Sequence, residues 1–191
     1  MEPADLAGRL AFVQTAEKLK DVLRSAHTSQ GRQESTPEHT WRLCLMAIVF
    51  QDRLAGLDFE RLLKICVIHD LGEALHGDVP AVRQTAQDNK ATGERNDLLA
   101  LMASLPAAVQ NELLALWDDY ENAASPEARA AKALDKLETI IQHNQGLNPP
   151  EFDYAFNLQY GQKHMAADPL FAQLRALVDA QTQEHIRPRT S

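Results

Sequence analysis

The residues of this chain best suited to chemistry are a histidine and an aspartate that stand side by side, His69 and Asp70. They follow an apolar run at residues 65–68, which belongs in a protein interior. Burying a charged carboxylate costs a large free energy unless the carboxylate is paired or coordinates a metal ion. Successive side chains of a helix point about 100° apart, so both can reach an ion beside the helix axis. The pair therefore suggests a metal site.

Two further residues, His39 and Asp135, complete a set of two imidazoles and two carboxylates. His39 lies one turn into a helix that Thr36 is expected to cap, and Asp135 lies in the apolar helical segment 131–141. Such mixed ligands suit one divalent ion of Mn, Co, Fe, Ni or Zn better than Ca. Taken singly, His39 fits better as a hydrogen-bonded core histidine and Asp135 as an ion-pair partner or cap. Spacing alone does not require the four residues to converge.

Helices are predicted for the segments that position these residues, because Leu and Ala dominate the apolar positions and recur at helical spacing. Cap-then-proline pairs open three of the helices, at residues 36, 125 and 168. The predicted class is all-α, a bundle of seven to nine helices. The expected helices cover residues 6–23, 36–55, 59–75, 98–102, 106–120, 128–143, 152–158 and 169–184, with loops at 25–34 and 144–150, a turn at 77–80 and irregular or loosely helical chain at 82–93.

Length and charge limit what the chain can do. Its 191 residues show no internal repeat or composition break, which predicts one domain, residues 1–191. A formal net charge of -8 repels a phosphate backbone, so extended nucleic acid is not an expected partner, whereas a small nucleotide remains possible. The apolar runs are too short to span a bilayer and no signal peptide is visible, which favours a cytoplasmic protein without membrane contact. Cys44 and Cys66 lie in apolar runs and are expected to be buried thiols.

The order His39, then His69-Asp70, then Asp135 on a helical chain resembles the HD superfamily of metal-dependent phosphohydrolases. The resemblance covers about residues 15–145, the core of the domain. Within the superfamily, this stretch resembles the branch of 5'-deoxynucleotidases in most detail. It is carried by the stretches ESTPEHTWR at 34–42, HDLGE at 69–73, GDVP at 77–80 and ALDKLE at 133–138, together with residues 113–121.

This resemblance implies a metal site with two catalytic carboxylates beside it. The matching metal ligands are His39, His69, Asp70 and Asp135, and the matching catalytic residues are Glu73 and Asp78. On a continuous helix, Glu73 would share the face of His69 and Asp70. Gly77 has the backbone freedom to aim Asp78 at the same site. The structural alternatives are a solvated helix-end charge for Glu73 and a turn residue for Asp78.

A phosphate group also needs a cation, preferably a planar guanidinium. Arg24 is the first candidate, because it is expected to end the first helix and the resembling family has an arginine there. Arg42 is the second candidate, with an ion pair as its structural alternative. The family typically has a tryptophan shortly after the first arginine, where this chain has His27. We therefore expect residues 25–31 to line the sugar side, and discrimination between deoxyribonucleotides and ribonucleotides to be weak.

The resemblance implies removal of the 5'-phosphate from (deoxy)nucleoside monophosphates by a homodimer. The nearest alternative is hydrolysis of a triphosphate or of guanosine tetraphosphate, for which further cations are generally needed. A non-catalytic nucleotide- or metal-binding module is a second alternative, and Glu73 and Asp78 argue against it. A helical scaffold would leave the buried His69-Asp70 pair unexplained. The C-terminal helices expected at 150–184 have no assigned role, and the tail 185–191 is a candidate for disorder.

Overall fold

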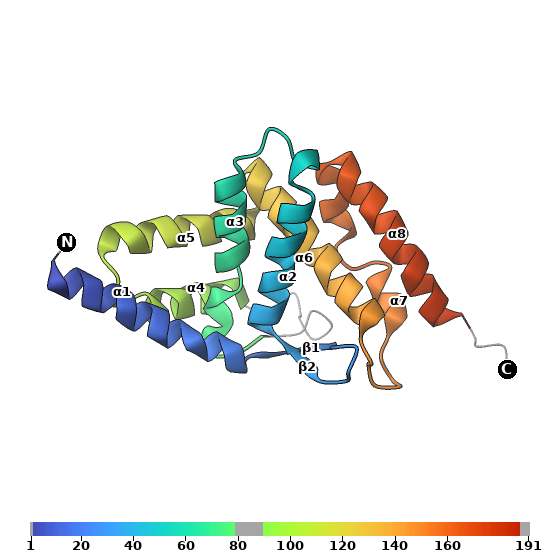
Figure 1. Cartoon of the computed structure of the whole chain (residues 1–191), viewed down its shortest axis with the longest axis horizontal. Coiled ribbons are helices and arrows are strands. Elements are labelled where there is room, and N and C mark those ends of the chain that lie inside the picture. Colours follow the sequence, from blue (N-terminus) through green and yellow to red (C-terminus); the bar gives the residue numbers. More distant parts are fainter. Residues whose placement is uncertain (1, 79–89, 188–191) are drawn as a thin grey trace.

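The computed structural model describes residues 2–78 and 90–187, and nearly all regular structure there is helical (Figure 1). This confirms the all-α prediction, and the eight α-helices of the described residues fall within the expected number. They are α1 (Pro3–Thr15), α2 (Thr36–Val49), α3 (Phe59–Ile68), α4 (Lys90–Leu101), α5 (Ala107–Asn122), α6 (Pro126–Gln145), α7 (Tyr154–Asn157) and α8 (Pro169–Ile186). The segment 79–89 and the last residues, 188–191, lie outside the described residues, and with them much of the expected turn, irregular stretch and tail.

Helix α6 is the central element, and it packs against α2, α3, α5 and α8 (Figure 1). Its start matches the sequence prediction, because the hydroxyl of Ser125 accepts a hydrogen bond from the Ala128 N–H at 3.0 Å. Its fully buried apolar positions carry alanines in the first half, such as Ala131, and branched side chains further along, such as Leu134 and Leu137. The alanines let neighbouring helices approach closely, so α6 can offer polar side chains to several elements at once.

The apolar side chains form two clusters that meet at the end of α3. Ile65 and Cys66 belong to the larger cluster, around α2, α6 and α8. Ile68 and Leu71 belong to the smaller one, beneath α4 and α5. The adjacent His-Asp pair therefore lies where the chain passes from one cluster to the other. None of the described helices has the length and apolar character needed to cross a membrane.

The first helix is shorter than predicted, and a small hairpin replaces much of the expected loop. After α1 comes a 3-10 helix, η1 (Ala16–Asp21), and then two antiparallel strands, β1 (Leu23–His27) and β2 (Gln33–Ser35). The Thr36 N–H donates to the Val22 carbonyl at 2.9 Å and holds the base of the hairpin closed. Strands this short show no clear alternation, so the sequence pattern contained no sign of them.

Helix α3 also ends earlier than predicted, at Ile68 instead of near residue 75. Asp70 leaves the helical conformation with φ −98° and ψ 4°, and the chain continues as a 3-10 helix, η3 (Leu71–Ala74). Helix α4 packs closely on this turn, since a Cβ placed on Gly72 would lie 2.6 Å from the Glu94 carbonyl oxygen. Only glycine allows that approach. Glu73 thus stands on a separate turn and not on the helix of His69.

Candidate metal centre

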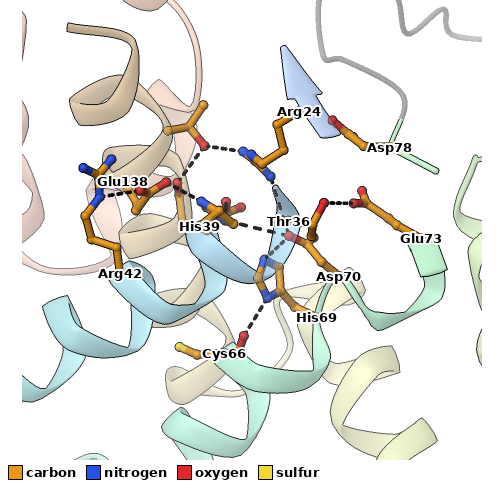
Figure 2. A network of polar contacts seen from close by, with 12 residues as sticks. Arg24, Thr36, His39, Arg42, Cys66, His69, Asp70, Glu73, Asp78 and Glu138 are labelled. Atoms are coloured by element: carbon orange, nitrogen blue, oxygen red, sulfur yellow. Dashed lines mark hydrogen bonds and ion pairs between the residues drawn. The ribbon is translucent and has the colours of Figure 1, made fainter. Parts of the chain in front are cut away.

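Three buried ligand atoms from two elements meet at the end of α3: His39 Nε2 from α2, with His69 Nε2 and Asp70 Oδ2 (Figure 2). The Asp70 oxygen lies 3.0 Å from His69 Nε2 and 3.7 Å from His39 Nε2. Within the described part of the chain, none of these three atoms has a hydrogen-bond partner. Buried polar atoms are normally paired, so three unpaired atoms facing one point indicate a place for a cation.

Asp135, the fourth predicted ligand, reaches this group from α6. Its Oδ1 lies 3.1 Å from His39 Nε2. Its Oδ2 accepts a hydrogen bond from the Tyr120 hydroxyl at 2.5 Å and lies 2.8 Å from Lys136 Nζ. Burial opposes the charge of Asp135, but Lys136 and the two histidines hold the pKa of Asp135 well below its usual range. The structure therefore brings His39, His69 and Asp70 together and places Asp135 against His39.

Each of the two histidines is held by a contact at Nδ1, which leaves its Nε2 facing the other ligand atoms. His69 donates from Nδ1 to the Cys66 carbonyl, one turn earlier on α3, at 2.8 Å. His39 makes its Nδ1 contact with the buried carboxylate of Glu138, which also accepts from Arg42 Nε at 2.6 Å. A proton on Nδ1 leaves a lone pair on Nε2, which is the form of histidine that binds metals. The geometry thus fits a metal ion.

Glu138 was not singled out in the sequence, although it lies three residues after Asp135 on one face of α6. Burial raises the pKa of Glu138, but His39 and Arg42 outweigh it and lower that pKa below the usual value. Burial and Arg24 in turn lower the pKa of His39, whereas Glu138 and Asp135 raise it to about 10. The surrounding carboxylates therefore favour positive charge at His39 Nε2, from a proton or from a metal ion.

A cavity of about 370 Å³ opens beside the ligand group, and Arg24 lies in its wall. The Arg24 side chain on β1 is mostly buried and points toward Asp70, with Nη1 3.6 Å from Asp70 Oδ2 (Figure 2). Its Nη2 donates to the Thr139 hydroxyl at 3.1 Å. Burial opposes the charge, but Asp70, Glu138 and Asp135 raise the pKa of Arg24 above its usual value. Arg24 thus presents a fixed cation beside the ligand atoms.

Glu73 and Asp78 line the same cavity, on the side toward α4. Glu73 is only 4% exposed, which excludes the solvated helix-end charge as its role. Lys90 Nζ lies 3.5 Å from Glu73 and 3.7 Å from Asp78. Burial, followed by the charges of Asp70 and Asp78, raises the pKa of Glu73 to about 9. Glu73 therefore holds a proton near neutral pH.

The other two predicted substrate residues do not line the cavity. Arg42 donates from Nε to Glu138 and from Nη1 to Gln145 at 2.9 Å, so its geometry supports the ion-pair alternative. His27 lies on β1, and of the predicted segment 25–31 the cavity lining includes only Ser25 and Ala26. Residues 25–27 pair with β2 as part of a strand, and residues 28–31 form the turn of the hairpin, so the predicted loop is shorter than expected.

Several cavity residues were missed in the sequence. His143 lines the cavity and contacts Asn157 Oδ1 at 2.8 Å. Lys132 and Lys136 lie one turn apart on the cavity face of α6, a spacing that the sequence does show. The C-terminal segment adds two aromatic residues, Phe156 and Tyr160. Because Lys132 pairs with Glu121 and Lys136 with Asp135, the two lysines add little unpaired charge.

The chain is similar to known proteins over most of its length. A family model described as HD domain matches residues 16–175, which extends about thirty residues beyond the stretch that carried the resemblance. The 5'-deoxynucleotidase HDDC2 of Danio rerio is 31% identical over 138 residues, 71% of this chain and 68% of that protein. The protein of the same name from Homo sapiens is 30% identical over 138 residues, 71% and 67% of the two chains.

A solved structure extends the similarity to the C-terminal elements. The "Predicted metal-dependent phosphohydrolase from Magnetospirillum magnetotacticum" is 27% identical, with a TM-score of 0.80 and coverage of 96% of each chain. A "Conserved hypothetical protein from Pyrococcus furiosus" is 25% identical, with a TM-score of 0.66 and coverage of 91% of this chain and 99% of the other. The aromatic cavity residues Phe156 and Tyr160 thus lie within the shared fold.

Proposed function

Because this chain belongs to the HD domain family, we propose that it removes the 5'-phosphate from (deoxy)nucleoside monophosphates with the help of one divalent metal ion. The observation that carries the proposal is the meeting of three unpaired, buried ligand atoms, from His39, His69 and Asp70, next to a cavity whose wall includes Arg24. The cavity volume of about 370 Å³ falls in the range of small-molecule sites. The names of the related 5'-deoxynucleotidases support a nucleoside monophosphate as substrate.

The proposed ligands are His39, His69, Asp70 and Asp135. Two imidazole nitrogens and two carboxylate oxygens suit Mn, Co, Fe, Ni or Zn. An ion bound there supplies Lewis acidity toward a phosphoryl oxygen and lowers the pKa of water. The Nδ1 contacts of His39 and His69 hold the two imidazole rings in place, so these ligands are oriented before an ion binds.

The remaining polar residues have separate roles in hydrolysis of the phosphate ester. Arg24 binds phosphate oxygens through charge-assisted hydrogen bonds, because its guanidinium already stands within 3.6 Å of Asp70. Glu73 holds a proton near neutral pH and donates it to the leaving 5'-oxygen. Asp78, next to it on the cavity wall, orients the attacking water. These assignments give the two carboxylates different tasks, which the sequence left undecided.

The cations of the cavity favour a monophosphate over the polyphosphate alternatives. A triphosphate or tetraphosphate carries more negative charge and generally needs additional unpaired cations. Each lysine on the cavity wall already has a carboxylate nearby: Lys90 with Glu94 at 3.1 Å, Lys132 with Glu121 at 3.6 Å, and Lys136 with Asp135 at 2.8 Å. Arg24 also lies near carboxylates, Glu34 at 3.4 Å and Asp70 at 3.6 Å, but it is the lining cation with a planar guanidinium, which suits one phosphate group.

A phosphate-release screen tests this proposal. Purified protein is freed of metal with EDTA and then given Mn²⁺, Co²⁺, Fe²⁺, Ni²⁺ or Zn²⁺ in separate reactions. Nucleoside mono-, di- and triphosphates serve as substrates, in deoxyribose and ribose forms. We expect release from monophosphates with at least one metal, and none from the metal-free protein. Release from triphosphates alone, or no release while the metal binds, would overturn the proposal.

We also propose a homodimer of one-domain subunits in the cytoplasm. Apolar side chains lie exposed on one face of α2, where Trp41 is 65% and Ile48 52% exposed, and a second copy of the chain is one way to cover them. The two free cysteines suit a reducing compartment. Light scattering on the purified protein tests the dimer, and a Trp41→Glu variant should then shift the mass toward that of one chain.

A further inference from the structure

Two aromatic side chains from the C-terminal part of the chain line the cavity that holds the candidate metal centre. They are Phe156 in α7 and Tyr160, which lies between α7 and the 3-10 helix η5 (Gln162–Ala167). Their ring centroids are 5.4 Å apart and their planes are inclined by 32°. Both side chains are only partly buried, and Phe156 belongs to neither apolar core cluster of the described residues. Packing within the core therefore does not account for Phe156.

The pair stands along the same face of α6 that carries Asp135. Lys136, the next residue of α6, places Nζ 5.2 Å from the centre of the Tyr160 ring. Further along this face, His143 contacts Asn157, the neighbour of Phe156 in α7. A helix rises about 1.5 Å per residue, so Asp135 and His143 are roughly 12 Å apart along α6. The cavity thus extends from the ligand group past the two rings.

The chemistry of the lining changes along the cavity: Tyr160 lies beside Lys136, which pairs with Asp135, whereas Phe156 lies next to Asn157, the partner of His143. Toward the ligand group the lining consists mainly of charged side chains, which bind ions and phosphate groups well. A flat uncharged group gains little there, but it stacks well on aromatic faces. A ligand with a charged end and an aromatic end would match this division.

We propose that Phe156 and Tyr160 form the binding site for the nucleobase of the substrate. This inference rests on the proposed function, which places the phosphate at Arg24 and the metal ligands, and it adds the residues that bind the other end. Stacking on an aromatic face is tolerant of base identity, because every base has a π-face. The site should therefore accept all bases and favour the larger purines over pyrimidines.

Kinetics with and without a base test the inference directly. The substrates are 2'-deoxyadenosine 5'-monophosphate and 2-deoxyribose 5-phosphate, which lacks the base. For Phe156→Leu and Tyr160→Leu we expect the KM of the nucleotide to rise about ten-fold or more, with kcat changed little. The KM of the sugar phosphate should stay as in the wild type. Tyr160→Phe keeps the ring and should restore nucleotide binding.

Phe152→Leu is the matched control. Phe152 is an aromatic residue of the same segment that packs against His143 and Tyr154, and it is not among the residues that line the cavity. An equal rise in KM in this control would show that the segment acts through packing and would overturn the inference. Thermal unfolding of each variant reports whether the fold survives the substitution.

A binding measurement separates this inference from the proposed function. Equilibrium dialysis in EDTA prevents metal-dependent turnover, and wild type should bind the nucleotide about ten-fold more tightly than the sugar phosphate. Phe156→Leu should remove most of that difference. Equal binding of both ligands by wild type overturns the inference, even if the metal-loaded protein hydrolyses nucleotides. A persisting difference without hydrolysis in the metal-loaded protein sustains the base site and overturns the proposed function. If Phe156→Leu does not fold, the wild-type comparison decides.

Discussion

The two ends of the cavity differ in the interactions that hold their residues: buried charges at the metal end and partly buried aromatic rings at the other. At the metal end, buried charges are held from behind: His69 by a backbone carbonyl and His39 by Glu138, while their Nε2 atoms face inward without partners among the described residues. At the other end, Phe156 and Tyr160 are partly buried rings in a short segment. The metal end is a fixed arrangement in which one lost partner is costly. The aromatic end tolerates adjustment, because stacking has few directional demands.

The largest effect is expected where a single change removes both a ligand and a charge. Asp70→Asn removes one of the two carboxylates of the proposed ligand group and leaves the two histidine Nε2 atoms and Asp135. We expect most of the bound metal to be lost, and activity to fall below detection. Metal analysis of purified protein, alongside phosphate release, measures both. Asp52→Asn on the exposed surface is the control. A variant of Asp70 that retains full metal would shift the centre toward His39 and Asp135.

A smaller effect is expected from a residue that acts beside the metal without holding it. Glu73→Gln should leave metal content near normal and lower kcat by about a hundred-fold, as for a lost general acid. The pKa of Glu73 is raised to about 9, so the acid form is present below that pH and is lost above it. A cation bound to Asp70 offsets one of the charges that raise this pKa, so the kcat of the metal-loaded wild type should fall with rising pH at or below about pH 9, and the variant should lack this decline.

Glu94→Gln provides the matched control for Glu73, since Glu94 also lies near Lys90, at 3.1 Å. Its effect on kcat should be far smaller. If Glu73→Gln loses metal, Glu73 is itself a metal ligand. The separation between residues that hold the metal and residues that act beside it would then be wrong.

How far the sequence could predict this site follows from the same contrast. A carboxylate next to an apolar run needs an explanation, so Asp70 and the adjacent histidine can be identified from the sequence alone. Glu138 supplies the Nδ1 contact of His39 from 99 residues away, and no local pattern reveals such a pairing. Phe156 and Tyr160 have ordinary helical spacing, which fits core packing equally well. Residues that must satisfy buried charge are thus easier to predict than residues that bind by shape.

The fold divides along similar lines. The cap-then-proline starts of α6 and α8 were predicted correctly, because the cap is a local interaction. At α2 the cap is Ser35, one residue before the predicted Thr36. The end of α3 was not predicted correctly, because close packing of α4 on Gly72 sets the turn that follows. The hairpin β1–β2 depends on pairing between segments and on the Thr36 contact to Val22. The position of Arg24 on a strand could therefore not be inferred from the helical pattern that precedes it in the chain.

An intermediate effect is expected for the phosphate cation. Arg24→Ala removes charge-assisted hydrogen bonds of roughly 1.5–3 kcal/mol, which corresponds to a ten-fold or greater rise in KM for a nucleoside monophosphate. Steady-state kinetics measures this, with Arg9→Ala on the exposed part of α1 as the control. The rise should be equal for the nucleotide and for 2-deoxyribose 5-phosphate, because both carry the phosphate. A rise confined to the nucleotide would place Arg24 at the base instead.

The smallest effect is expected at His27, where the structure changes what the sequence suggested. The residue pairs with Gln33 across the hairpin, and its carbonyl accepts a hydrogen bond from Gln142 at 2.5 Å. Because its side chain is not among those lining the cavity, His27→Trp should alter kcat/KM by no more than about two-fold, as for a substitution away from the site. Parallel kinetics on 2'-deoxyadenosine and adenosine 5'-monophosphates gives the ratio between the two sugars. That ratio should be the same in wild type and His27→Trp, whereas Ser25→Val, at a position that does line the cavity, should change it. If the ratio changes in His27→Trp, the side chain at position 27 contacts the sugar. The rigid, metal end of the cavity would then include part of the hairpin as well as the charged residues.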